Sequence, residues 1–325
     1  MRAIYRFVLR LPLLAIAPVL SLVAALVSAQ PAASAKPIFA AHNHDAGRVD
    51  IGGGRHLYLE CRGEGGPTVI LEAGYRSHPS VWTEDFLRPE EPRTMVLDGV
   101  AAFTRVCLYE RPGAPFDADH PRRSDPVPQP RTVDEVVADL HALLVGAGVP
   151  GPYVLVGHSL GGLVARLYAA TYPEEVGGMV LIDAFSEHLL GALTPEQATA
   201  LLQLSEAPGL ADDPDLETLD LRAAAERMRV APPVPPMPLS VLSAGRLPST
   251  DLGPDVLQAL RSGFADALDE AARVNQAALA ELVPGARHVV AAGSGHNIHL
   301  EQPDLVIAAV RQVAEAVLRT TTDVR

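Results

Sequence analysis

The sequence predicts an α/β fold in which helices cover both faces of a mostly parallel β-sheet. Short apolar runs of strand length recur along the chain, among them residues 68–72, 153–156 and 178–183. Segments whose apolar residues recur at helical spacing lie between such runs, as at residues 132–144. Strands that alternate with helices are joined by crossover connections, which make neighbouring strands parallel and bury both faces of the sheet.

The amino terminus has the layout of a secretory signal peptide. Arginines precede an uncharged run over residues 11–30, and small-residue motifs typical of cleavage sites end at Ala29 and Ala35. We therefore assign residues 1–35 to a signal peptide and the start of a linker, which predicts an exported, periplasmic or extracellular protein. The uncharged run is also long enough for an uncleaved membrane anchor, which remains the alternative.

Residues 36–325 are predicted to form one domain, because their number suits a single large α/β unit. The net charge of −13 disfavours nucleic acid and anionic membrane surfaces as partners. A polar tether is expected over residues 36–46, where His42 and His44 are too few to predict a metal site.

Eight segments have the apolar or alternating pattern of strands. They are residues 48–51, 55–61, 68–72, 103–109, 153–156, 178–183, 239–243 and 288–291. Gly52-Gly53-Gly54 divides the first two into a predicted hairpin. A helix-length segment with Trp82, Phe86 and Leu87 precedes the fourth strand, and a proline-rich loop over residues 112–130 follows it.

Helices account for most of the rest. A capping box, Thr132-x-x-Glu135, begins the helix before the fifth strand. Residues 185–236 contain no convincing strand but two helical runs, the second over residues 216–228, and predict a small helical cap inserted over the sheet. Further helices are expected from about residue 254 to 282 and from 304 to 319.

Gly157-His158-Ser159-Leu160-Gly161 has the G-x-S-x-G pattern of a nucleophile elbow, between an apolar strand and a helical stripe. Its small flanking residues allow a strained turn that exposes a serine oxygen. Ser159 is therefore the candidate nucleophile. The alternative is an ordinary glycine-rich turn between a strand and a helix.

A serine hydroxyl needs a base to accept its proton, and His296 is the candidate. It follows the last predicted strand in the glycine-rich stretch Gly293-Ser294-Gly295. His158 and His299 are expected to be structural neighbours.

The acid that orients the histidine should lie between serine and histidine in the chain. Asp183 directly follows the strand after the elbow, which places it at the same edge of the sheet as Ser159. Asp251 follows the next strand, but only after a longer connection. Asp183 is preferred, and a strand-end aspartate that only caps its own turn is the structural alternative.

Three motifs occur in an order similar to that of the alpha/beta-hydrolase superfamily: G-H-S-L-G-G at the elbow, Y-E-R-P-G at residues 109–113 and S-G-H-N-I-H-L-E-Q-P at residues 294–303. The chain resembles the serine esterase and lipase type of that superfamily. The resemblance implies an eight-stranded sheet and an oxyanion hole made by the backbone N–H groups of Leu160 and Tyr75. The histidine that many relatives have beside Tyr75 is missing here.

The resemblance also brings Cys61 and Cys107 together, since the second and fourth strands are neighbours in that fold. An exported chain would meet an oxidising compartment, so we expect a disulfide between them. Two buried free cysteines are the alternative.

The function predicted on these grounds is that of an exported carboxylic-ester hydrolase, which forms an acyl-enzyme on Ser159 and needs no cofactor or metal. Its expected partner is a small-molecule ester, because the cap is short. An aminopeptidase or acyltransferase on the same scaffold is the enzymatic alternative, and a binding protein that has lost catalysis is the non-enzymatic one.

Overall fold

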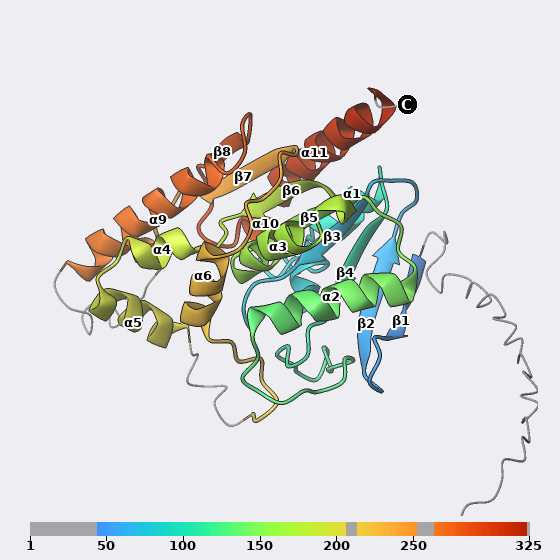
Figure 1. The fold of residues 1–325 in the computed structure, drawn as a ribbon, viewed down its shortest axis with the longest axis horizontal. Coiled ribbons are helices and arrows are strands. Elements are labelled where there is room, and N and C mark those ends of the chain that lie inside the picture. Colours follow the sequence, from blue (N-terminus) through green and yellow to red (C-terminus); the bar gives the residue numbers. More distant parts are fainter. Residues whose placement is uncertain (1–43, 206–212, 252–262, 324–325) are drawn as a thin grey trace, which may run out of the picture. The chain divides into compact units, whose positions relative to one another are not determined.

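In the computed structural model, which describes residues 44–205, 213–251 and 263–323, eight strands form one sheet in the order β1-β2-β4-β3-β5-β6-β7-β8 (Figure 1). The strands are β1 (His44–Asp50), β2 (His56–Arg62), β3 (Thr68–Glu72), β4 (Val106–Tyr109), β5 (Tyr153–His158), β6 (Val176–Ile182), β7 (Leu239–Ala244) and β8 (Arg287–Ala291). β1 and β4 each run antiparallel to β2, and all other neighbouring pairs are parallel. The predicted mostly parallel, eight-stranded sheet is confirmed.

Helices cover both faces of this sheet, as predicted. On one face the core includes buried side chains of α2 (Val133–Ala147) and α3 (Leu160–Thr171), together with the end of α9 (Phe264–Ala280). On the other face it includes side chains of α1 (Val96–Ala101) and α11 (Pro303–Asp323). The shorter helical elements are η1 (Pro79–Trp82), η2 (Pro173–Glu175), α4 (Glu187–Gly191), α5 (Pro195–Leu204), α6 (Leu221–Arg229), α7 (Pro248–Asp251) and α10 (Ile298–Glu301).

The predicted capping box begins α2. The backbone N–H of Glu135 donates to Thr132 Oγ1 at 3.3 Å, and the Glu135 carboxylate accepts from the backbone N–H of Thr132 at 2.7 Å. Two of the N–H groups that a helix start leaves without partners are thereby satisfied. Gly148 ends α2 in the left-handed conformation, with φ 65°.

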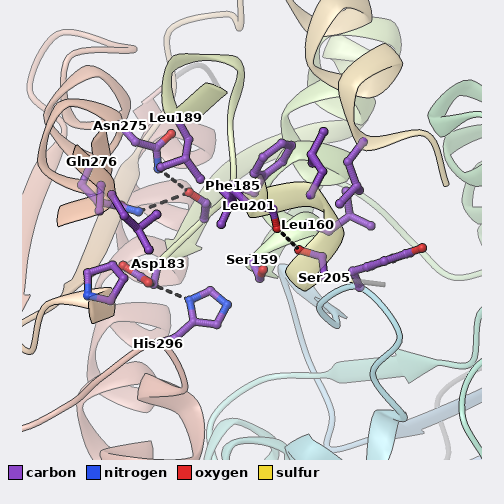
Figure 2. Close-up of a pocket in the computed structure, with 17 residues that line it drawn as sticks. Ser159, Leu160, Asp183, Phe185, Leu189, Leu201, Ser205, Asn275, Gln276 and His296 are labelled. Atoms are coloured by element: carbon purple, nitrogen blue, oxygen red, sulfur yellow. Dashed lines mark hydrogen bonds and ion pairs between the residues drawn. The ribbon is translucent and has the colours of Figure 1, made fainter. Parts of the chain in front are cut away.

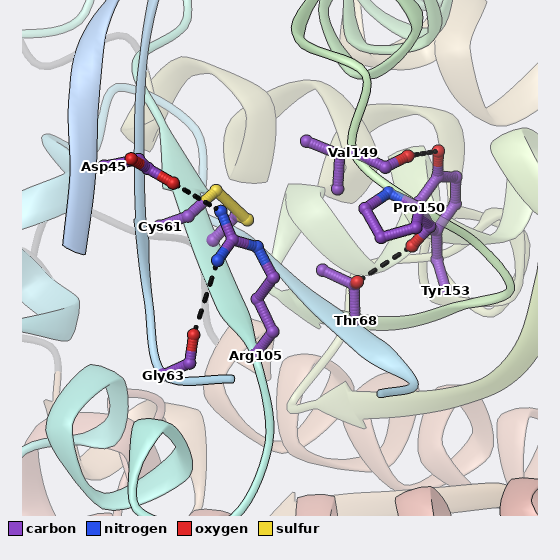
Figure 3. Close-up of a disulfide and its surroundings, with 9 residues drawn as sticks. Asp45, Cys61, Gly63, Thr68, Arg105, Val149, Pro150 and Tyr153 are labelled. Carbon is purple, nitrogen blue, oxygen red and sulfur yellow. Dashed lines mark hydrogen bonds and ion pairs between the residues drawn. A yellow bond between two sulfur atoms is a disulfide. The ribbon is translucent and has the colours of Figure 1, made fainter. Parts of the chain in front are cut away.

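The predicted disulfide between Cys61 and Cys107 is present (Figure 3). The antiparallel register of β2 and β4 pairs these two residues directly, so both side chains lie on the same face of the sheet. Both are fully buried. Beside them Arg105, the residue before β4, donates to the carboxylate of Asp45 in β1 at 3.0 Å.

Two local predictions are wrong. Residues 75–95 contain no regular helix longer than η1, because Pro79 begins that turn and the Asp85 carboxylate accepts backbone N–H bonds from Leu87, Arg88 and Arg93. A side chain that binds the backbone in this way competes with helix formation. The second concerns the predicted tether: its last residues, 44–46, belong to β1, in which His44 pairs with Arg62.

The cap is helical, and α4, α5 and α6 lie within it. A bidentate ion pair from Arg166 of α3 to Glu187 of α4, at 2.8 and 2.9 Å, attaches it to the elbow helix. The second helix predicted in the cap corresponds to α6. It begins later than predicted, at Leu221, with Asp220 as its N-cap. The residues before it, 213–219, form an irregular strap that crosses to the loop after β4.

The predicted helix from about residue 254 is described only from Phe264, and its first part lies outside the described residues. The predicted signal peptide or anchor also lies outside them, so export and the boundary at residue 35 remain predictions. Within the described ranges, no helix has both the length and the hydropathy needed to span a bilayer.

Candidate active site

The elbow lies between β5 and α3, and its backbone is strained at Ser159. The φ and ψ angles of this residue are 54° and −121°, a conformation that side-chain-bearing residues rarely adopt. Steric crowding requires glycine at two positions of the motif. A Cβ on Gly157 would lie 2.4 Å from the carbonyl oxygen of Gly161, and one on Gly161 would lie 2.3 Å from that of Glu72.

Backbone hydrogen bonds hold Ser159 against the end of β6. Its N–H donates to the carbonyl of Ile182 at 3.1 Å, and its own carbonyl accepts from the N–H of Phe185 at 2.9 Å. The next residue after β6 is Asp183, so these bonds place the predicted acid and the predicted nucleophile at the same edge of the sheet.

Asp183 and His296 form a hydrogen-bonded pair, although 113 positions separate them in the chain. Nδ1 of His296 lies 2.7 Å from Oδ2 of Asp183. An ionised carboxylate can only accept, so Nδ1 is the donor of this hydrogen bond, and in that tautomer of a neutral imidazole Nε2 is the acceptor nitrogen. The other carboxylate oxygen accepts from the N–H of Ala244 at 3.0 Å, which fixes the orientation of the carboxyl group.

Ser159, Asp183 and His296 line one cavity of about 250 Å³ beneath the cap (Figure 2). In Figure 2 the His296 ring faces Asp183 on one side and Ser159 on the other. The competing acid, Asp251, ends α7, and its side chain lies outside the described residues. The structure thus brings the three predicted side chains together, whereas their catalytic roles remain a prediction.

Two buried histidines lie behind His296, with ring centroids 4.6 Å apart for His158 and His296 and 4.2 Å for His158 and His299. His158 Nε2 donates to the carbonyl oxygen of His296 at 3.0 Å and so supports the loop that bears it. Burial lowers the pKa of His299 to about 3, and burial together with the neighbouring histidines lowers that of His158 well below its ordinary value. Both are therefore neutral packing partners at ordinary pH.

Tyr75 and Leu160, whose N–H groups are the predicted oxyanion donors, line the same cavity. Leu160 is the first residue of α3, where a backbone N–H has no acceptor within the helix. The loop that bears Tyr75 lies close to the elbow, since a Cβ on Gly74 would lie 3.0 Å from His158 Nδ1 and 3.4 Å from Ser159 Cβ.

A buried charged network beneath this loop has no counterpart in the sequence-based prediction. Arg111 donates to the carboxylates of Glu72 and Glu217 and to the carbonyl oxygens of Ala73 and Gly74. Arg111 belongs to the Y-E-R-P-G motif, which is the signal that could have indicated it.

The remaining lining of the cavity is mainly apolar and comes from the cap and α9. These side chains are Phe185, Leu189, Leu201, Leu202, Leu221 and Leu268. Two amides of α9 stabilise the connection after β6: Asn275 and Gln276 both donate to the carbonyl oxygen of Ala184, at 2.7 and 3.2 Å (Figure 2). Sequence reasoning missed both. Within the described ranges, no cluster of three or more His, Cys, Asp or Glu side chains could hold a metal ion.

Comparisons with known proteins agree with this fold. The model of a family described as alpha/beta hydrolases matches residues 69–309. An uncharacterised protein of Schizosaccharomyces pombe is 40% identical over 154 residues, which are 41% of this chain and 27% of that protein. Lipase LipV of Mycobacterium tuberculosis is 38% identical over 98 residues, 28% of this chain and 36% of the lipase. The chain thus spans well under two thirds of either relative.

Among solved structures, the carboxylesterase CesB from Bacillus subtilis superposes with a TM-score of 0.52 and 17% sequence identity. The match covers 85% of this chain and 93% of that one. At this identity the likeness shows a shared fold.

Proposed function

This chain belongs to the alpha/beta hydrolase family, and from that membership we propose that it is a serine esterase that hydrolyses small carboxylic esters through an acyl-enzyme on Ser159. One observation carries the proposal: a strained Ser159 shares a cavity with a His296 whose Nδ1 is paired with Asp183. A histidine oriented by a carboxylate in this way can accept the proton of a neighbouring serine hydroxyl.

In the first half of the reaction, Ser159 Oγ forms a bond to the carbonyl carbon and His296 Nε2 takes the hydroxyl proton. The N–H groups of Leu160 and Tyr75 donate to the oxyanion. The C–O bond to the alcohol then breaks, and the alcohol leaves with the proton from His296. Water repeats these steps on the acyl-enzyme and releases the acid.

The lining of the cavity favours an uncharged ester. Among its described residues, Asp183 is the only carboxylate and it is paired with His296, so none is left to bind the ammonium group of an aminopeptidase substrate. A cavity of about 250 Å³ between apolar cap side chains suits a short acyl or alcohol chain. Export, which the leader-like terminus supports, belongs to the same proposal.

Turnover of p-nitrophenyl acetate and butyrate, against an aminoacyl p-nitroanilide, tests the proposal. We expect ester hydrolysis, little anilide hydrolysis and covalent labelling by a fluorophosphonate probe. Ser159→Ala should lower ester turnover about 10⁴-fold or more and abolish labelling, because the triad residues act as a unit.

Ser205→Ala is the matched control. Ser205 lines the same cavity, but its hydroxyl donates to the carbonyl of Leu201, so the variant should still be labelled by the fluorophosphonate probe. Ester turnover by Ser159→Ala within tenfold of the parent would contradict the proposal. Preferred cleavage of the anilide would replace the esterase with an aminopeptidase.

A further inference from the structure

We propose that Arg111 and Glu217 are positioning residues of the oxyanion hole: they hold the Gly74–Tyr75 peptide so that the Tyr75 N–H points into the cavity. The inference rests on the proposed function, because it concerns the oxyanion of the same reaction. It adds that a residue of the cap, Glu217, takes part in building the hole.

Arg111 uses all five of its N–H donors in this network. Nε and one Nη2 hydrogen bind the Glu217 carboxylate, at 2.6 and 3.0 Å. Nη1 binds Glu72 and, at 2.8 Å, the carbonyl oxygen of Ala73, and the remaining Nη2 hydrogen binds the carbonyl oxygen of Gly74. The side chains of Arg111, Glu72 and Glu217 are 5%, 2% and 2% exposed, so solvent does not compete for these bonds.

The bond to Gly74 fixes the direction of the next N–H. The Gly74 carbonyl and the Tyr75 N–H belong to one planar trans peptide, in which the two groups point in opposite directions. With the carbonyl held by Arg111, the Tyr75 N–H is directed away from Arg111. The opposite side of this loop is the elbow, where Gly74 approaches Ser159.

Glu217 holds both Arg111 and the backbone beyond Tyr75. Its Oε2 accepts from the N–H of Arg76 at 2.8 Å, and its carbonyl oxygen accepts from Nε of Arg76 at 2.9 Å. Arg76 has φ 51°, so its backbone is held in a conformation that a non-glycine residue seldom adopts unaided. Glu217 therefore fixes the peptides on both sides of Tyr75.

The strap, residues 213–219, keeps Glu217 in place. The Glu217 N–H donates to the carbonyl of Gly113 at 2.7 Å, and a Cβ on Gly113 would lie 2.5 Å from that same nitrogen. The last residue of the Y-E-R-P-G motif thus has to be small for the strap to pass, and its third residue supplies the guanidinium. The first residue, Tyr109, donates to Glu72 at 2.5 Å.

Misdirection of an oxyanion donor can be separated from general damage by two matched substrates. A thionoester has sulfur in place of the carbonyl oxygen, and sulfur accepts hydrogen bonds more weakly, so the parent should hydrolyse it much more slowly than the ester. The ratio of kcat/KM for the two substrates in one preparation does not depend on how much of the protein is folded. The intrinsic difference between the two substrates is the same for every variant, so a change in the ratio reports a change in what the enzyme gains from its oxyanion donors.

Glu217→Gln puts an NH₂ donor against the donors of Arg111 and Arg76. We expect it to lower kcat/KM for the ester about 10- to 100-fold, less than the loss of a complete oxyanion donor, and to lower that for the thionoester by less than threefold. The ester/thionoester ratio should therefore fall at least threefold. Arg111→Lys, which cannot reach Gly74 and Glu217 together, should lower the ratio in the same way.

Asp213→Asn is the matched control, because Asp213 belongs to the same strap but pairs with Arg122, away from Tyr75. It should leave the ratio at the parent value. If Glu217→Gln yields no active protein, Glu217→Asp is measured in its place, with the same expectation. Equal ratios in the parent and in the variants of Glu217 and Arg111 overturn the positioning role, whereas a parent that neither hydrolyses the ester nor reacts with the fluorophosphonate refutes the proposed function instead.

Discussion

Ser159 has a backbone conformation that costs a residue with a side chain on the order of 1–3 kcal/mol. The surroundings keep it there: β5 and α3 fix the directions of entry and exit, and the end of β6 binds its N–H and carbonyl. Asp183, with φ 38°, is held in a similar way by the backbone of β7. Strain at both residues accompanies the exposure of their side chains to the cavity.

The first prediction at this scale concerns the orienting acid. Asp183→Asn should lower ester turnover by up to about 10⁴-fold, because an amide cannot hold the Nδ1–H tautomer as a carboxylate does. Asp251→Asn, compared in parallel, should lose far less. Steady-state kinetics of the two purified variants check this, and the reverse order would move the role of the acid to Asp251.

The second prediction concerns pH. Burial lowers the pKa of His299 from 6.5 to about 3. Between these two pH values the unfolded chain binds a proton at His299 and the folded chain does not. The contribution of His299 to the free energy of unfolding is fully present above pH 6.5. It is lost as the pH falls toward 3, by about 1.4 kcal/mol per pH unit.

His299→Leu removes this titration and keeps an apolar side chain against Trp82. We measure the free energy of unfolding by urea titration between about pH 4.5 and 6. Its slope against pH should be smaller in the variant than in the parent, by about 1.4 kcal/mol per pH unit. Parallel dependences would mean that His299 is protonated in the folded state.

At the scale of single elements, α3 depends on glycine where it approaches β3. Alanine in a helix is favoured over glycine by about 1 kcal/mol, so propensity alone predicts that Gly161→Ala stabilises the protein. The Cβ would lie 2.3 Å from the backbone oxygen of Glu72, which cannot rotate away, and this contact outweighs propensity.

We therefore expect Gly161→Ala to lower the free energy of unfolding by about 1–3 kcal/mol and to reduce ester turnover, because α3 carries the elbow. Gly47→Ala in β1 is the control, since its Cβ would meet no atom within 4 Å. Urea titrations with parallel ester assays decide the matter. A Gly161→Ala protein as stable and active as the parent would show that the elbow can shift freely.

For the molecule as a whole, the disulfide closes a loop of 46 residues that contains β3, α1 and the loop of Tyr75. In the chain-entropy model the bond lowers the entropy of the unfolded chain and so raises the free energy of unfolding by about 3–4 kcal/mol. The double variant Cys61→Ala, Cys107→Ala should be less stable by about that amount in urea titrations. Mass spectrometry of alkylated, non-reduced parent protein should find no modified thiol, and two alkylated cysteines would contradict the bond.

Local patterns in the sequence were enough to predict most elements and the elbow. Apolar periodicity, the Thr132 capping box and the glycines around Ser159 act between residues close together in the chain, so their consequences can be worked out without the fold. Where a local pattern was misleading, as around Phe86, a side chain competed for the backbone and turned an apparent helix into a loop.

Only the tertiary structure decided how the site is assembled. The pairing of Asp183 with His296, 113 positions apart, depends on strand order and on how two loops fold over one edge of the sheet. The contact of Arg111 with Glu217, 106 positions apart, depends on where the strap crosses the loop after β4. The sequence by itself determined the chemical groups and the elements that bear them, because these follow from local geometry. Their partners were decided by packing, because hydrogen bonds and ion pairs act over a few ångströms in space at any separation in the chain.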